Sequence, residues 1–158
     1  MKNHIITQAE YDFLIDLLAK LKKDDEIALK DLKHALNYGS ETWHDNDMYD
    51  TAKTKQINLD KEKKEIQQIL KSAKVIVPEE MSSAKVGIGN RVRLENTDNK
   101  ETMTINIGGS EATRLGEGWI SLTSPLGEAI KNQTQGSIVI LKLPEYDVHY
   151  KILDIESI

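Results

Sequence analysis

The chain contains no cysteine, and this absence excludes disulfide bonds and cysteine-ligated metal centres. Long apolar runs are also missing, since none approaches the roughly 20 residues that a helix needs to cross a bilayer. The amino terminus lacks the basic and then apolar segments of a secretory signal. We therefore expect a cytoplasmic protein with no membrane partner.

Aromatic residues are scarce as well. They make up 5% of the 158 residues, and apolar residues as a whole make up 39%. These fractions are low for a single compact globule, although the length would accommodate one ordinary domain or two small ones. A long helical arm with one apolar seam and a large solvated surface would explain the shortage.

A basic region is the third missing feature. The net charge is −5, with 13 Lys or Arg against 16 Asp or Glu in residues 1–80 and 8 against 10 in residues 81–158. Proteins that bind duplex nucleic acid by themselves usually carry a basic stripe. We therefore expect no autonomous binding of duplex DNA.

Two long segments carry the heptad pattern of a coiled coil, with positions that alternate in steps of three and four residues. The first set is Tyr11, Leu14, Leu18, Leu21, Asp25, Ala28, Leu32 and Ala35, and the second is Tyr49, Ala52, Gln56, Leu59, Lys63, Ile66, Leu70 and Ala73. Pairing them so that the two residue numbers sum to 84 places a turn near Thr42, where the periodic pattern stops. This predicts an antiparallel hairpin of two helices, from about Gln8 to Leu36 and from about Asn46 to Ala73.

Local signals support the hairpin. Thr7 and Glu10 have the spacing of a capping box at the start of the first helix. Asp25 and Lys63 are the charged residues in the two seams, and in this register they lie diagonally opposite each other. We expect a partly solvated salt bridge that specifies the alignment of the helices, a known role of polar seam residues.

From Lys85 onward the pattern changes to short strands separated by turns. Alternation predicts strands at residues 91–95, 101–107, 119–123, 137–143 and 148–155. Ser124 and Pro125 predict the start of a short helix that ends near Lys131. The glycine pairs 87/89 and 108/109 are too sparse for phosphate-binding loops, and we assign them to turns.

The predicted fold class is therefore α+β. An antiparallel coiled-coil arm covers residues 1–77, a linker covers residues 78–84, and a small antiparallel sheet domain with one short helix covers residues 85–158.

The turn of the predicted hairpin is acidic. No Lys or Arg occurs from His34 to Ala52, whereas Glu41, Asp45, Asp47 and Asp50 all lie there. Hard divalent cations prefer oxygen ligands, and an arm of roughly 45 Å would project such carboxylates far from the sheet domain. The alternative is a solvated loop without a role.

Three stretches carry a family resemblance: residues 6–22 (ITQAEYDFLIDLLAKLK), 45–56 (DNDMYDTAKTKQ) and 118–141 (GWISLTSPLGEAIKNQTQGSIVIL). Together and in this order, they resemble the Gre-type transcript-cleavage factors of bacterial RNA polymerase. The resemblance implies an FKBP-like fold for the sheet domain, which would dock on the rim of the polymerase's secondary channel. Ser124 and Pro125 would contact the polymerase there, while the hairpin enters the channel.

The resemblance also implies a chemistry. In cleaving members of the family, tip carboxylates hold a second Mg²⁺ at the polymerase active site and activate water against the transcript backbone. By resemblance, Glu41 and Asp45 would be catalytic. With Asp47 they would ligate Mg²⁺ shared with the polymerase, and the free protein would bind none. The factor would not be an enzyme by itself, would contact the 3′ end of nascent RNA indirectly, and would be a monomer.

The tip departs from the family pattern, which has Gly-Asp-Leu-Ser-Glu-Asn where this chain has residues 39–46, Gly-Ser-Glu-Thr-Trp-His-Asp-Asn. The loop between the glycine and the next tyrosine of the family pattern is two residues longer here. Asp45 and Asn46 best match the Glu-Asn pair, whereas Glu41 is only the nearest candidate for the other acid. Trp43, His44 and Asn46 are candidate contacts with the partner, with packing over Tyr38 and Tyr49 as the alternative for Trp43.

Three functions stay open at this point. The first is stimulation of transcript cleavage, and the second is inhibition or modulation of the polymerase from the same channel without cleavage. The second follows from the altered tip, because a metal site tolerates displacements of only a few tenths of an ångström. A scaffold unconnected with transcription is the third.

Overall fold

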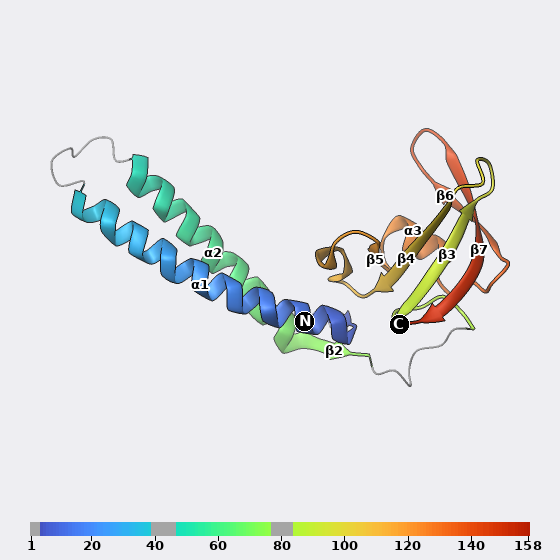
Figure 1. Cartoon of the computed structure of the whole chain (residues 1–158), viewed down its shortest axis with the longest axis horizontal. Helices are drawn as coiled ribbons and strands as arrows, with labels where there is room; N and C mark the ends of the chain where they lie inside the picture. The colour runs from blue at the N-terminus through green and yellow to red at the C-terminus, as the bar shows by residue number, and fades with distance from the viewer. Residues whose placement is uncertain (1–3, 39–46, 77–83) are drawn as a thin grey trace. The chain divides into compact units, whose positions relative to one another are not determined.

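The structure is a computed structural model that describes residues 4–38, 47–76 and 84–158, with only the backbone described for Tyr38. The chain forms two compact units (Figure 1). We call Phe13–Ser72 the arm, and Met1–Asp12 together with Ala73–Ile158 the sheet unit. None of the helices in the described part of the chain is long and apolar enough to cross a membrane.

The arm contains the two predicted helices. Helix α1 (Gln8–Tyr38) begins at the predicted residue and ends two residues later than predicted, and its first turn belongs to the sheet unit. Helix α2 (Asp47–Ser72) ends one residue before the prediction. The two helices lie side by side along the arm in Figure 1.

The seam of the arm follows the predicted heptads. Leu14, Leu21, Ala28 and Ala35 lie seven residues apart on α1, and each is at most 5% exposed. All the predicted seam positions of both helices are buried or half-buried, whereas most positions between them are exposed. Because apolar burial stabilises a structure by roughly 1.5–3 kcal/mol for each large aliphatic side chain, this seam is the main source of the arm's stability.

The sheet unit is built on a five-stranded sheet in the order β5-β4-β3-β7-β6. Its strands are β3 (Asn90–Asn96), β4 (Thr102–Gly108), β5 (Trp119–Ser121), β6 (Ile138–Lys142) and β7 (Asp147–Ser157). All five predicted strands are present, and so is the short helix, α3 (Pro125–Ile130). The α+β class is confirmed.

One strand pair corrects the prediction of a fully antiparallel sheet. The pairs β3–β4, β3–β7 and β6–β7 are antiparallel, but β4 and β5 are parallel. Parallel neighbours need a crossover connection. Here the ten residues between them, which include the 3-10 helix η3 (Ala112–Leu115), return the chain to the edge of β4.

The core of the sheet unit lies on one face of this sheet. Val92 and Leu94 of β3 and Ile152 of β7 have no exposed surface, and Ile130 of α3 is equally buried in the same cluster. Arg91, which precedes Val92, is exposed on the opposite face. The alternation of β3 thus separates a core face from a polar face.

Sequence analysis did not predict a second, two-stranded sheet. Strands β1 (His4–Ile6) and β2 (Ala73–Val75) pair in parallel, and the backbone N–H of Ile76 donates to the carbonyl oxygen of Ile6 at 2.9 Å. This pairing groups both ends of the hairpin with the sheet unit, so the compact units divide the chain differently from the predicted boundary at residue 77. Strands of three residues are too short to show a periodic pattern.

Candidate functional site

Most of the predicted site residues belong to the segment of the sequence between α1 and α2. Glu41, Trp43, His44, Asp45 and Asn46 lie outside the described residues, so the roles predicted for them stay predictions. Asp47 is described, as the exposed first residue of α2, and Asp50 is exposed in the same turn. Carboxylates in the first turn of a helix interact favourably with its dipole, so this acidic segment also favours the start of α2.

A groove of about 460 Å³ lies beside this end of the arm, between the last turns of α1 and the first turns of α2. Its lining residues are Asp31, His34, Ala35, Asp47, Met48, Thr51, Ala52 and Lys55. Ala35 and Ala52 are seam residues whose small side chains leave space, and Met48 is 68% exposed. An apolar floor with a charged rim next to the tip is a suitable surface for contact with a partner.

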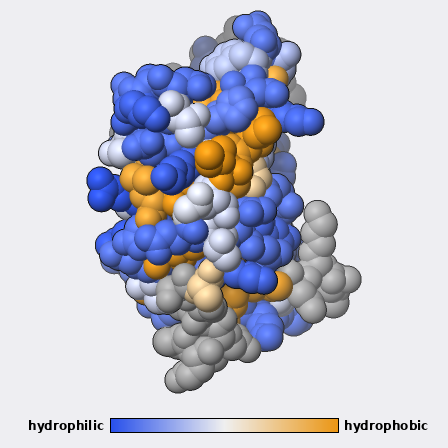
Figure 2. Space-filling model, turned by 90° about the vertical axis from the view of Figure 1, so that its right-hand side faces the viewer, coloured by the Kyte–Doolittle hydropathy of each residue, from blue (hydrophilic) through white to orange (hydrophobic). Residues whose placement is uncertain are grey.

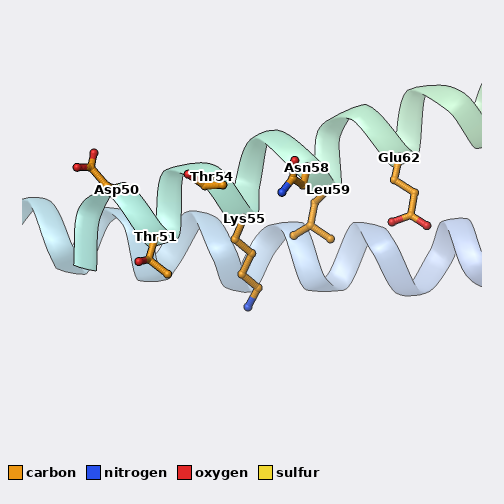
Figure 3. Close-up of a pocket in the computed structure, with 7 residues that line it drawn as sticks. All are labelled: Asp50, Thr51, Thr54, Lys55, Asn58, Leu59 and Glu62. Carbon is orange, nitrogen blue, oxygen red and sulfur yellow. The ribbon is translucent and has the colours of Figure 1, made fainter. Parts of the chain in front are cut away.

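A second groove, of about 600 Å³, runs further along α2 (Figure 3). Its seven lining residues all come from this helix: Asp50, Thr51, Thr54, Lys55, Asn58, Leu59 and Glu62. Figure 3 shows the side chains of Lys55 and Leu59 on the side of α2 that faces α1. Among the residues that the structure describes, no group of three His, Asp or Glu side chains is placed to hold a metal ion.

The charged seam residues form the predicted salt bridge. Lys63 Nζ donates to Asp25 Oδ2 at 2.5 Å and to Asp60 Oδ1 at 3.2 Å, and the Lys63 and Asp25 side chains are only 15% and 14% exposed. The hydrogen bond to Asp25 raises the pKa of Lys63. Hydrogen bonds from Lys64 and Lys63 lower the pKa of Asp60. Because the pair lies within the seam, its position fits the predicted role of specifying the alignment of the helices.

Ser124 and Pro125, the predicted docking residues, form the start of α3. Ser124 Oγ accepts a hydrogen bond from the backbone N–H of Gly127 at 3.2 Å, and Pro125 is exposed at the first helical position. A Cβ atom on Gly127 would lie 2.3 Å from the carbonyl oxygen of Ser121. The turn is therefore tightly packed on its inner side and presents the proline ring to solvent, while its contact with a partner stays a prediction.

An exposed apolar surface on strand β6 was missed from the sequence. Ile138 and Ile140 are 62% and 48% exposed, and Tyr146 in the following turn is 63% exposed. Figure 2 shows apolar residues among hydrophilic ones on one face of the molecule. The signal was the unbroken apolar run of residues 138–141, because a strand with one solvated face usually alternates. Such a patch on an edge strand is a candidate contact surface.

Comparisons with known proteins match the second half of the chain to a family model and most or all of it to individual relatives. A family model described as "Transcription elongation factor, GreA/GreB, C-term" matches residues 81–157. The transcription elongation factor GreA of Neorickettsia sennetsu is 34% identical over 112 residues, which cover 71% of this chain and 70% of that protein. GreA of Lachnoclostridium phytofermentans is 31% identical over 158 residues, which cover 99% and 97%. A solved structure, GreA factor homolog 1 of Thermus thermophilus, is 22% identical, covers 99% of this chain and 100% of its own, and has a TM-score of 0.46.

Proposed function

Because this chain belongs to the GreA/GreB family of transcription elongation factors, we propose that it binds bacterial RNA polymerase and stimulates cleavage of backtracked transcripts. In this proposal the sheet unit docks on the polymerase, with Ser124 and Pro125 at the contact. The arm carries its tip into the secondary channel. The scissile bond and the first metal ion belong to the polymerase, so the protein is an accessory factor that acts in the cytoplasm.

The observation that supports this function best is an acidic tip at the end of a narrow arm. Helix α2, with 26 residues, is about 39 Å long at 1.5 Å per residue, and a helix with its side chains is about 10 Å wide. The segment that joins α1 to α2 contains Glu41 and Asp45, and no Lys or Arg occurs from His34 to Ala52. Two paired helices are therefore a thin support for carboxylates that must reach a site inside another protein.

The chemistry proposed for the tip uses oxygen ligands. Glu41, Asp45 and Asp47 would hold a Mg²⁺ ion shared with the polymerase, which stabilises the attacking and leaving oxygens of the displacement. Of the three, the structure describes only Asp47, whose exposed position in the first turn of α2 leaves its oxygens accessible to a partner's ion. Trp43, His44 and Asn46 would contact the polymerase beside the 3′ end of the RNA.

The test adds the protein to stalled elongation complexes and measures the release of short 3′ RNA fragments. We expect the wild-type protein to release them and the Glu41→Ala/Asp45→Ala variant to be slower by roughly 100-fold, as when a group that stabilises a transition state is removed. The matched control is Asp16→Ala/Glu26→Ala, which removes two exposed acids elsewhere on α1. No fragments at any Mg²⁺ or Mn²⁺ concentration would contradict cleavage stimulation.

The altered tip favours a second candidate function, inhibition of the polymerase from the same channel. The two additional residues between the glycine and the tyrosine would displace a carboxylate by several ångströms, which breaks a metal site. This function predicts competition with a cleaving factor and slower nucleotide addition without RNA fragments. The same stalled complexes distinguish the two functions, because only the first yields fragments.

A further inference from the structure

Glu10 is buried more completely than the capping box requires. Its side chain is 1% exposed, whereas glutamate is rarely buried unless its charge is satisfied. The carboxylate accepts hydrogen bonds from the backbone N–H and the hydroxyl of Thr7 at 2.7 and 2.9 Å, which belong to the cap. It also accepts from the backbone N–H groups of Gly109 at 2.9 Å and Glu111 at 3.1 Å, about a hundred residues further along the chain.

The loop that donates these bonds packs closely against the segment before α1. A Cβ atom on Gly109 would lie 1.8 Å from the carbonyl oxygen of Ile5, and one on Gly108 would lie 2.5 Å from the Cβ of Ala112. The backbone N–H of Ser110 donates to that same carbonyl oxygen of Ile5 at 3.3 Å. The glycine pair that we assigned to a turn therefore allows a backbone contact that any side chain would prevent.

Side chains around this contact support both partners. His4 Nδ1 lies 3.0 Å from Ser110 Oγ and 3.4 Å from Glu111 Oε1, which connects β1 with the loop. Arg114 Nε donates to Glu111 Oε2 at 2.9 Å, which anchors the loop to η3. The loop is thus held on both sides while its N–H groups point at Glu10.

We propose that Glu10 is a positioning residue, a latch that holds the first turn of α1 to the loop at residues 108–111 so that docking and the action of the arm are coupled. This inference rests on the proposed function. Glu10 is the third residue of α1, a continuous helix that ends beside the tip. If the first turn is released, the tip adopts a distribution of positions, and misplacement by 1 Å can cost about 100-fold in rate even when its cause lies far from the chemistry.

The main variant is Glu10→Gln, which keeps the size of the side chain. Four donors converge on the two carboxylate oxygens, and an amide has only one oxygen and a competing NH₂ group. At least one backbone N–H of Thr7, Gly109 or Glu111 therefore loses its acceptor. The matched control is Thr7→Val, which removes the capping hydroxyl but leaves both bonds from the loop to Glu10.

Two measured quantities, the affinity for the polymerase and the maximal effect on it, separate binding from activity. With stalled elongation complexes saturated by each protein, we expect Glu10→Gln to bind the polymerase within about threefold of the wild-type affinity. Its maximal rate of fragment release, or its maximal inhibition if the protein inhibits, should fall about tenfold or more. Thr7→Val should keep the wild-type maximum. A Glu10→Gln variant that is folded and has the wild-type maximum would overturn the latch.

A second measurement does not depend on the polymerase. Because the chain has no cysteine, spin labels can be placed at Lys30→Cys on α1 and Lys142→Cys on β6, and the distribution of distances between them can be measured. We expect Glu10→Gln to broaden this distribution relative to the wild type and Thr7→Val to leave it unchanged. Distance distributions of equal width in the wild type and Glu10→Gln would refute the positioning role of Glu10. A wild-type protein without effect on the polymerase would refute the proposed function alone. If Glu10→Gln does not fold, Glu10→Asp, which keeps the charge but shortens the reach, takes its place in both measurements.

Discussion

The salt bridge in the seam of the arm allows a quantitative test of how the hairpin is aligned. Asp25 and Lys63 are about 85% buried, and Asp25 Oδ1 has no hydrogen-bond partner among the described residues. Exposed ion pairs contribute about 0–1 kcal/mol, whereas removal of one partner from a fully buried pair costs about 3–5 kcal/mol. Lys63→Leu leaves the Asp25 carboxylate without its cation, and we expect a loss of about 3 kcal/mol. Asp25→Leu should cost less, about 2 kcal/mol, because Lys63 keeps Asp60 as a partner.

The double variant Asp25→Leu/Lys63→Leu should recover this loss, since two leucines in a heptad seam replace two partly desolvated charges. We expect a stability between that of the wild type and about 2 kcal/mol above it, which corresponds to a rise in Tm of up to roughly 8 °C for a chain of this size. Urea and thermal unfolding, followed by helical circular dichroism, measure all four proteins of the cycle. If the losses of the single variants simply add in the double variant, the two side chains are not coupled and the argument fails.

Four further predictions concern the pH dependence of two groups, metal binding and packing. The pKa of Lys63 is raised in the folded protein, so its charged form stabilises the arm at pH values below the ordinary lysine value of 10.5. This stabilisation is lost as the pH rises through the higher folded-state pKa. Unfolding measured at alkaline pH should therefore show a loss of stability in the wild type that Lys63→Leu lacks. The lowered pKa of Asp60 acts in the opposite direction. The stabilisation from its charged form is present at pH values above 3.8 and is lost as the pH falls through the lower folded-state pKa. Asp60→Asn should remove this part of the loss of stability in acid. The free protein should bind Mg²⁺ only weakly, because exposed carboxylates are hydrated and Mg²⁺ sheds its water reluctantly; calorimetry that found a micromolar site abolished by Asp45→Asn would contradict a shared ion. Gly127→Ala should cost about 2–3 kcal/mol in urea unfolding, because its Cβ would clash with the backbone of Ser121, whereas Gly87→Ala, whose Cβ would lie no closer than 3.8 Å to Asn90 Oδ1, should stay within about 0.5 kcal/mol of the wild type.

The local patterns of the chain predicted its main elements. The heptads place Leu14, Leu21, Ala28 and Ala35 in one buried row, and the register that they imply brings Lys63 to Asp25. The N-cap at Ser124 is read from adjacent residues in the same way, since its hydrogen bond to Gly127 spans only three positions. Patterns of this kind determine a helix or a strand because each depends on interactions between residues that are close in the sequence or regularly spaced along it.

Only part of the candidate site can be predicted from the sequence. The acidic segment from Glu41 to Asp50 is evident from residue types alone, as is its departure from the family pattern. The apolar outer face of β6 was hidden because a run such as residues 138–141 is also typical of a strand buried on both faces. Only the folded sheet shows that the core, with Val139, covers one face of β6 and leaves Ile138 and Ile140 exposed on the other.

Tertiary structure alone decided the contacts that join distant parts of the sheet unit. The parallel pairs β1–β2 and β4–β5 have no local signature, because the partner of each strand is chosen by where intervening elements return the chain. The second role of Glu10 is of the same kind. Its bond to Thr7 follows from a four-residue motif, but its bonds to Gly109 and Glu111 exist only because the folded chain brings a loop within 3.1 Å of it. A carboxylate must find its hydrogen-bond donors wherever folding buries it, and no periodicity in the sequence records that position.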